Sequence, residues 1–544
     1  MLFCLSLIIF AICQQNLIIS STTVNDDHSL QSNVTPPKLR ILIMVPKTQI
    51  TTTHYVLHRK MAELLAADAE NVEKVLMLVA HDSCDETTEV PVEFDGRFLI
   101  WYRMTLASSA QKGGENCQTA LNFWRQDQRK WPLWEYNPAR FLPNAEKAAT
   151  TNLAFLKYHW KLIEQLKQFK FNVGIMETIP GELTLSIFQA IPTIKKYVGS
   201  QSVAPSISHW KYFGYDKIVG AMPGNSLALF GDHKFATENA IKENPTYFRE
   251  RNENLYIKPA ESSARLLQRK YFEAIEHGIL SRQIFKDFLF HEKVAEWEIK
   301  RIDLYFTNIQ PFLDFPIVEQ EIERERNNTH QNRVNFIGGI TMSKGKVPNL
   351  NPDTKQIFES AKDGVVLLSF GSAVEMDDGD ERAVSVKNIV VDVFKQYPQM
   401  NLIIKWGKRP PTGTVEQYNK LSENVYAKSW LEQEAILGGG LKLFITHGGL
   451  NSINEAVKFG VPIILFPFFG DQYNNAEALA AREVAKVLDI RSKTLKKDFA
   501  EALDEMFNKY SSYKQRMNEL SKKMNSVEPA KEFVEKFRQL RKSL

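Results

Sequence analysis

Short apolar runs alternate with stretches of helical periodicity along most of the chain. The apolar run 39–45 is followed by a helical pattern over 51–66 and by a second apolar run over 75–80. Strands of a parallel sheet are covered on both faces, so they are apolar throughout and are connected by helices. This order of strand, helix and strand predicts a parallel α/β sheet in the N-terminal half.

The same alternation continues along the rest of the chain. The further strands and helices are expected at 145–167, 171–176, 304–307, 334–337, 365–370, 381–397 and 402–405. A segment rich in Gly, Pro, Asn and Ser covers 338–352, which indicates a boundary between domains. A chain of 544 residues is long enough for two cores, since single cores rarely exceed about 250–300 residues. We therefore predict two α/β domains, 38–340 and 341–544.

The first residues of the chain resemble a secretory signal. The apolar run 2–13 ends with the small residues Ala11 and Cys13, which predicts cleavage after residue 13. The run is shorter than the roughly 20 apolar residues that span a bilayer. No longer apolar run follows it, so we expect a protein of the endoplasmic reticulum lumen or a secreted one, anchored in a membrane only if the sequence is truncated.

Charge and cysteine content narrow the classes of protein to which the chain can belong. The 68 basic and 64 acidic residues are spread along the chain, which gives no case for nucleic-acid binding. Cys84 and Cys117 lie outside the signal and either form one disulfide or remain two thiols. A glycosylation sequon begins at Asn327, which fits a glycoprotein of the secretory pathway.

The segment 441–472 carries the most specific chemistry. An apolar strand ends in the turn His447-Gly448-Gly449, and a helix opens at Asn451. Glycines let a ligand approach the backbone closely, and the free N–H groups of a helix N-terminus attract phosphate. Glu455 lies one turn further on, where an ionised carboxylate suits the two hydroxyls of a ribose. The segment therefore predicts a nucleoside-diphosphate site.

Residues 444–472 resemble the donor signature of the UDP-glycosyltransferases, the family that includes the UDP-glucuronosyltransferases. The stretch 429–433 resembles the start of that signature, with Glu432 where proline is usual. The resemblance implies a GT-B fold of two facing Rossmann-like domains with the donor site in the interdomain cleft. It also implies that the last helix, expected at 532–540, folds back onto the N-terminal domain. Gly438–Gly440 departs from the family's usual turn.

The resemblance also implies roles for individual donor-site residues. Trp430 would stack on uracil, Gln433 would lie at the nucleoside, Glu455 would bind the ribose, Asp471 and Gln472 the sugar hydroxyls, and His447, Asn451 and Ser452 the diphosphate. Backbone N–H groups near Ser372 and Gly449 would add to the diphosphate site. No metal or other cofactor is expected, and Asp378-Gly-Asp380 is interpreted as a helix cap.

A general base is needed because a hydroxyl is a poor nucleophile at neutral pH. His54 follows the first strand, where the family has its catalytic histidine, and its place at a helix N-terminus is expected to keep the ring neutral. His58, one turn later, is the alternative base, although a surface role is expected for it. Glu177 follows the strand 171–176, where the family has an aspartate, and would orient the imidazole.

These observations predict an inverting transferase that moves glucose or glucuronic acid from a UDP-sugar to a small lipophilic acceptor, as in detoxification. The region 206–270 is expected to line the acceptor pocket, although it contains no recognisable motif. Two alternatives are a non-catalytic protein that binds UDP-sugars or lipids and a UDP-sugar epimerase.

Overall fold

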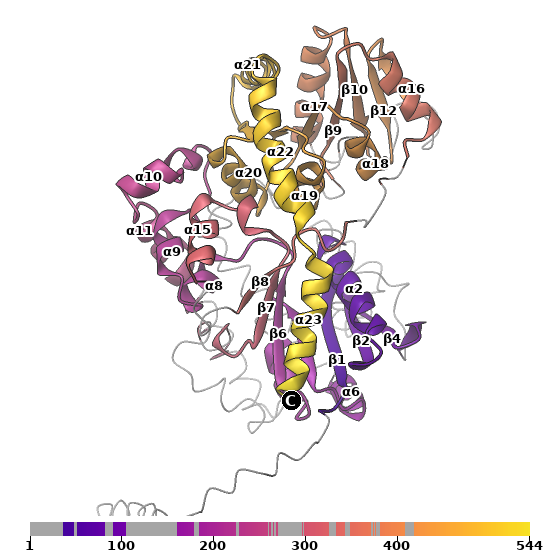
Figure 1. Cartoon of the computed structure of the whole chain (residues 1–544), viewed down its shortest axis with the longest axis vertical. Helices are drawn as coiled ribbons and strands as arrows, with labels where there is room; N and C mark the ends of the chain where they lie inside the picture. The colour runs from indigo at the N-terminus through magenta and orange to yellow at the C-terminus, as the bar shows by residue number, and fades with distance from the viewer. Residues whose placement is uncertain are drawn as a thin grey trace, which may run out of the picture. The chain divides into compact units, whose positions relative to one another are not determined.

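The computed structural model describes residues 36–47, 52–81, 91–104, 160–178, 184–224, 228–258, 299–325, 333–342, 349–371, 381–407 and 418–544, with a few single residues and pairs of residues between them. From Lys38 onward these residues form one compact unit that contains two separate sheets (Figure 1). Among the described helices, none combines the length and the apolar composition that crossing a bilayer requires. The predicted signal, Cys84, Cys117, Asn327, Ser372 and Asp378–Asp380 lie outside the described residues.

The N-terminal sheet has eight strands in the spatial order β3-β4-β2-β1-β5-β6-β7-β8. Their bounds are β1 Leu39–Lys47, β2 Val72–His81, β3 Val92–Asp95, β4 Phe98–Met104, β5 Val173–Glu177, β6 Lys196–Gln201, β7 Leu304–Thr307 and β8 Val334–Phe336. All neighbouring strands are parallel except β3 and β4. Most residues of the central strands β1, β2 and β5 are buried and apolar, as expected for parallel strands covered by helices.

The C-terminal sheet has seven strands in the order β11-β12-β10-β9-β13-β14-β15. Their bounds are β9 Gly364–Ser369, β10 Met400–Lys405, β11 Asn419–Ser422, β12 Val425–Lys428, β13 Leu443–Thr446, β14 Ile463–Leu465 and β15 Ala485–Val487. Without the antiparallel edge strand β11, this is the strand order of a doubly wound nucleotide-binding fold. The predicted class of two Rossmann-like α/β domains is thereby confirmed.

Helices connect the strands and cover the sheets. In the N-terminal half they are α2 Thr52–Ala67, α6 Trp160–Gln168, α7 Thr184–Gln189, α8 Ile207–Tyr212, α9 Asp216–Ala221, η3 Asp232–Phe235, α10 Glu238–Glu243, α11 Arg249–Asn252, η4 Glu253–Ile257, η5 Pro311–Leu313 and α15 Pro316–Glu325. In the C-terminal half they are α16 Pro352–Ser360, α17 Glu381–Phe394, α18 Gln433–Gly438, α19 Leu450–Lys458, α20 Gln472–Ala481, α21 Leu495–Asn508, α22 Tyr510–Ser526 and α23 Pro529–Lys542.

Each sheet has a point where the direction of winding reverses. In the N-terminal sheet this point lies between β1 and β5, and in the C-terminal sheet it lies between β9 and β13. Ligands of open α/β sheets bind beyond the carboxyl ends of the strands at such points. The topology therefore predicts that the residues that follow β1, β5, β9 and β13 form the ligand sites.

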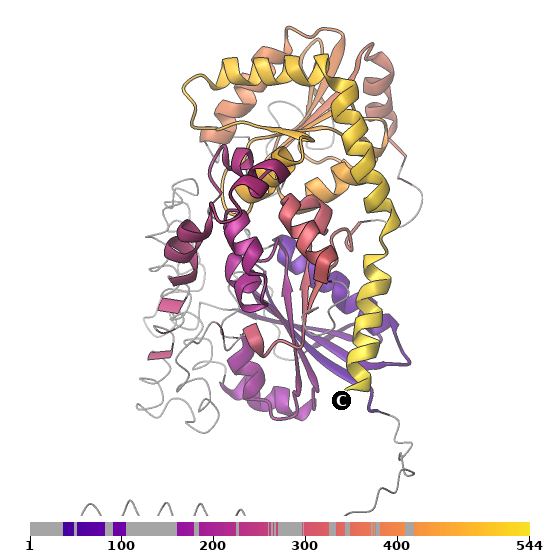
Figure 2. The ribbon, with the colours of Figure 1, turned by 60° about the vertical axis from the view of Figure 1, so that its left-hand side comes forward.

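The last helix, α23, packs on the N-terminal sheet (Figures 1 and 2). The ring of Phe537 stacks on Phe306 of β7, with ring centres 5.8 Å apart, and Phe533 meets the same ring edge-on at 4.9 Å. All three side chains are buried. Arg538 adds an ion pair of 2.9 Å to Asp68, next to the end of α2. The C-terminal end of the chain is thus part of the N-terminal core.

Replacing Phe537 by alanine is expected to destabilise this half of the protein by about 3–5 kcal/mol, because the substitution leaves a cavity in a close-packed core. Urea denaturation followed by circular dichroism measures the change. Gln539→Ala on the exposed face of the same helix is the control and is expected to change stability by less than about 0.5 kcal/mol. Equal urea midpoints for Phe537→Ala and the parent would show that α23 is not anchored by this ring.

Candidate active site

His54 and Glu177 meet at the switch point of the N-terminal sheet. β1 and β5 are parallel neighbours with Met44 opposite Met176, so the segments that leave their carboxyl ends lie side by side. Glu177 is the last residue of β5, and His54 lies in the first turn of α2, which follows β1. His54 Nδ1 lies 3.0 Å from Glu177 Oε2, although the ring is not aligned for a linear hydrogen bond. The structure brings the two predicted catalytic residues together.

Ser202 also holds the carboxylate of Glu177. Its hydroxyl donates to Glu177 Oε2 at 2.7 Å, and its backbone N–H donates to Oε1 at 3.3 Å. Burial favours the neutral acid, but the attraction of His54 and the Ser202 hydrogen bond outweigh it and lower the pKa of Glu177. Glu177 therefore carries a negative charge directly behind the imidazole.

The charge of Glu177 also decides the protonation of His54. Burial opposes the imidazolium, but the nearby carboxylate overcomes this effect and raises the pKa of His54 above its ordinary value of 6.5. Asp471 in the C-terminal half raises this pKa further. The pKa of His54 thus shifts in the opposite direction to the one expected from the helix N-terminus, because a buried opposite charge is stronger than a helix end.

His58 is a core residue and has no free nitrogen to act as a base. Its side chain is fully buried. Its Nδ1 lies 2.8 Å from the carbonyl oxygen of His54, which can only accept, and its Nε2 lies 2.5 Å from Ser200 Oγ. Burial lowers the pKa of His58, so the ring is neutral. The expected surface role is wrong, because one helical turn places His58 against the sheet.

In the C-terminal half, the ring of His447 lies between two glycines beyond the ends of β9 and β13. A Cβ atom on Gly371 would lie 2.8 Å from the ring, and one on Gly449 would lie 2.6 Å from it, which no side chain can do. Burial lowers the pKa of His447 to about 3, and the positive charge of Lys405 acts in the same direction. His447 is thus a neutral hydrogen-bonding group at the proposed diphosphate position.

The first two turns of α19 carry the predicted phosphate and ribose ligands. Gly449 caps the helix, Asn451 and Ser452 lie in its first turn, and Glu455 follows one turn later. Gln433 of α18 connects this set, since its Nε2 donates to Ser452 Oγ at 3.1 Å and to Glu455 Oε2 at 2.7 Å. Burial raises the pKa of Glu455, while the Gln433 hydrogen bond opposes the rise.

Trp430 lies 70% exposed after β12, so its ring is accessible for stacking. Lys405, the last residue of β10, places its amine 4.9 Å above that ring. Burial lowers the pKa of Lys405, and Glu455 opposes the change. This lysine was not predicted as a site residue. The sequence did contain a signal for it, because Lys405 is a charged residue at the carboxyl end of an apolar strand.

Asp471 caps α20 and Gln472 is the first residue of that helix, and the start of α20 lies beside the His447 turn. Asn475 donates through Nδ2 to Asp471 Oδ2 at 2.7 Å and to the carbonyl oxygen of Gly448 at 3.0 Å, so it joins the start of α20 to the His447 turn. Gln472 accepts from the backbone N–H groups of Phe468 and Phe469 at 2.8 and 3.2 Å. Its oxygen is therefore committed to the loop before α20, which leaves its NH2 group for a sugar hydroxyl.

The glycines at the end of α18 form an ordinary connection despite their departure from the family's turn. Gly439 donates its N–H to the carbonyl oxygen of Ala435 at 2.9 Å, and Gly440 has a positive φ of 92°. A Cβ atom on Gly438 would lie 2.2 Å from Val347. The helix thus ends with a left-handed glycine and leads directly into β13.

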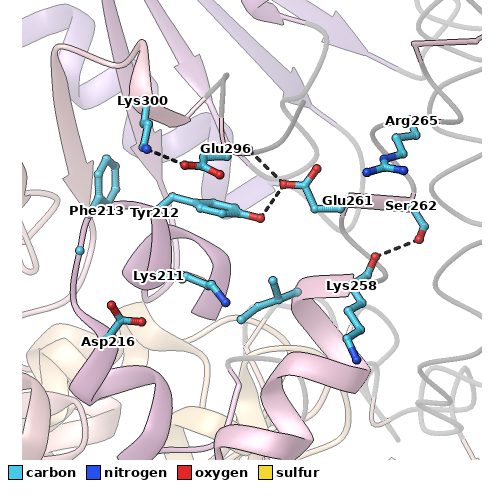
Figure 3. Close-up of a pocket in the computed structure, with 12 residues that line it drawn as sticks. Lys211, Tyr212, Phe213, Asp216, Lys258, Glu261, Ser262, Arg265, Glu296 and Lys300 are labelled. Atoms are coloured by element: carbon cyan, nitrogen blue, oxygen red, sulfur yellow. Dashed lines mark hydrogen bonds and ion pairs between the residues drawn. The ribbon is translucent and has the colours of Figure 1, made fainter. Parts of the chain in front are cut away.

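A separate pocket of about 790 Å³ lies in the region expected to line the acceptor site (Figure 3). The Tyr212 hydroxyl donates to Glu261 at 2.6 Å, and Lys300 pairs with Glu296 at 2.5 Å. The lining includes neither His54 nor Glu177. We therefore do not assign the acceptor to this pocket. Within the described part of the chain, no three His, Cys, Asp or Glu side chains are grouped closely enough to hold a metal ion.

Comparison with known proteins identifies a matching family model and several relatives. Residues 312–533 match the family model described as UDP-glucoronosyl and UDP-glucosyl transferase. UDP-glucuronosyltransferase 2B17 of Homo sapiens is 32% identical over 190 residues, which cover 35% of this chain and 33% of the human protein. A nematode relative, ugt-50 of Caenorhabditis elegans, is 24% identical over 299 residues, covering 52% of this chain and 51% of the relative. The chain thus spans about half the length of one relative and about a third of the other.

Solved structures resemble the whole fold. CalG4, the calicheamicin glycosyltransferase, has a TM-score of 0.56 at 15% identity and covers 92% of this chain and 98% of its own. A UDP-glucose:anthocyanidin 3-O-glucosyltransferase in complex with UDP has a TM-score of 0.55 at 15% identity, with 93% and 99% covered. Both are glycosyltransferases, and at this identity they establish the two-domain GT-B fold. Through residues 312–533, the chain is similar to the UDP-glycosyltransferase family.

Proposed function

We propose that the protein transfers a sugar from a UDP-sugar to the hydroxyl of a small lipophilic acceptor. The proposal rests on the residues found at the two switch points, one in each sheet. One holds the His54–Glu177 pair, and the other holds the residues of the family's donor signature. Asp471, from the donor half, raises the pKa of His54, so the two groups lie within electrostatic range. A nucleotide sugar in the C-terminal site would then present its anomeric carbon toward His54.

In this proposal each half has one task. His54 removes the proton from the acceptor hydroxyl as the oxygen attacks the anomeric carbon, and Glu177 stabilises the imidazolium that forms. The bond from the anomeric carbon to the UDP oxygen breaks on the opposite face, which inverts the configuration. Backbone N–H groups at the start of α19, with His447 and Asn451, hold the departing diphosphate. These donors supply the charge stabilisation, so the reaction is proposed to need no metal.

The donor sugar is proposed to be glucose or glucuronic acid. Asp471 and the NH2 group of Gln472 suit the hydroxyls that both sugars share. Lys405 adds a cation near Glu455 and His447, close to where ribose and diphosphate would lie. The apolar run at residues 2–13 supports a place in the secretory pathway, where a role in detoxification would be carried out.

The experiment measures UDP release by the purified protein with UDP-glucose or UDP-glucuronate, with and without a phenol as acceptor. We expect release that depends on the acceptor, that favours one donor and that persists in excess EDTA. UDP-sugar interconversion without an acceptor would instead indicate an epimerase. UDP binding without turnover for any donor and acceptor pair would indicate a binding protein and would overturn the proposal.

A further inference from the structure

Asn308 connects the two halves of the site. It follows the last residue of β7 and extends that strand's pairing with β6, because its N–H donates to the carbonyl oxygen of Gln201 at 2.9 Å. Its side chain is buried, and its amide Nδ2 donates to Asn451 Oδ1 of the donor helix α19 at 2.8 Å. A second contact to the same helix runs from Asn454 Nδ2 to the backbone oxygen of Asn308 at 3.3 Å.

The orientation of the Asn308 amide is set by a third contact. The nitrogen that donates to Asn451 also lies 3.4 Å from the carbonyl oxygen of Ser202, which can only accept. The nitrogen of Asn308, and not its oxygen, must therefore be on this side. Asn451 then faces Asn308 with its own oxygen, because a nitrogen placed there would meet another donor. Asn308 Oδ1 has no hydrogen-bond partner among the residues that the structure describes.

We propose that Asn308 is a positioning residue that sets the amide of Asn451 for the donor diphosphate. With its oxygen held by Asn308, Asn451 has only its NH2 group left to offer, and this group donates to an anionic phosphate oxygen. An amide turned the other way would present its oxygen to the phosphate and repel it. The inference deepens the proposed function and rests on it.

The same residue reaches toward the catalytic pair. Ser202, whose backbone oxygen contacts the Asn308 amide, donates its hydroxyl to Glu177, and Glu177 contacts His54. Asn308 therefore lies between the donor helix α19 and Ser202, which holds the carboxylate of Glu177. This position gives the N-terminal domain a means of setting a donor ligand that belongs to the C-terminal domain.

The test compares binding of UDP and uridine by isothermal titration calorimetry, using Asn308→Asp and Asn308→Ala in the full chain. A carboxylate at position 308 accepts the Asn451 NH2 group and turns the Asn451 oxygen to the diphosphate. We expect the Kd for UDP to rise by about tenfold or more in Asn308→Asp and by a smaller factor in Asn308→Ala. The Kd for uridine, which has no diphosphate, should change by less than about twofold.

A double-mutant cycle separates this role from a purely structural one. In an Asn451→Ala background the Asn308→Asp substitution is expected to have little further effect on the Kd for UDP, because the group through which it acts is gone. Asn454→Ala, which removes only the neighbouring contact, is the matched control and should bind UDP within about twofold of the parent.

The outcomes are distinguishable. If the parent protein does not bind UDP, the proposed function fails, and this inference fails with it. If the parent binds UDP and both Asn308 variants bind it equally well, the inference alone is overturned. The same conclusion follows if the full effect of Asn308→Asp persists without Asn451, since a direct repulsion would then explain it.

Discussion

Replacing His54 by alanine is expected to slow sugar transfer by about 10²–10⁴-fold, the range contributed by a positioned general base. UDP affinity should stay unchanged, because the donor ligands lie in the C-terminal half and do not involve this ring. The measurement is the initial rate at saturating donor, with UDP binding followed separately by calorimetry. The loss should fall on kcat with acceptors of ordinary acidity. It should shrink for phenols acidic enough to ionise without help.

Chemical rescue provides the control for this variant. Added imidazole should restore part of the activity of His54→Ala, because the space left by the ring lies beside Glu177 and the side chain is 14% exposed, not sealed. Rescue also shows that the variant is folded. A His54→Ala protein that transfers sugar at the parental rate would contradict the assignment of the base. His58 would not replace it, since both of its nitrogens are occupied in the core.

Much of the fold could be predicted because the central strands are apolar and continuous. β7 was predicted with its exact bounds, and β1, β2 and β10 within a few residues. β6 (Lys196–Gln201) was not predicted because its sequence KYVGSQ contains few apolar residues, although its last four residues are buried between β5 and β7. The edge strand β3 was also missed. All four of its residues are exposed, so it lacks the apolar run that marks a buried strand. Burial at these positions is decided by tertiary neighbours, which local pattern does not contain.

The candidate site shows the same division. Asn451, Ser452 and Glu455 could be predicted together because they share one face of a helix that follows one strand. Asn308 could not, because it reaches α19 only through the packing of the N-terminal half against the C-terminal half. Lys405 was missed because its strand, β10, lies far from α19 in the sequence, although its charge at the end of an apolar strand was a usable signal. The direction of the pKa shift of His54 was also mispredicted. A helix N-terminus destabilises a nearby positive charge by about 0.3–1 kcal/mol, and the attraction of a buried carboxylate at contact distance outweighs this effect.

Glu177 is therefore the residue whose replacement should alter both the rate and its pH dependence. In the parent protein, Glu177 raises the pKa of His54, and transfer requires the unprotonated ring. The rate should accordingly rise with pH through this elevated value and then level off. Glu177→Gln removes the charge that opposes desolvation, so the pKa of His54 falls and the rising limb moves to lower pH. The plateau should fall by about 100-fold or more, because the ring becomes a weaker base and its imidazolium loses its partner.

Glu177→Asp is the matched variant, since it keeps the charge and shortens the side chain by one methylene. Ser202 donates to both carboxylate oxygens of Glu177, so a shorter side chain cannot keep both Ser202 and His54 within 3.0 Å without movement. We expect Glu177→Asp to keep the rising limb near its parental pH and to recover a large part of the lost rate. Glu177→Gln could instead lower the rate without moving the rising limb of the pH–rate profile. The carboxylate would then stabilise the fold and would not set the pKa of His54. An unchanged rate and an unchanged limb would remove Glu177 from the mechanism, and His54 would then act alone.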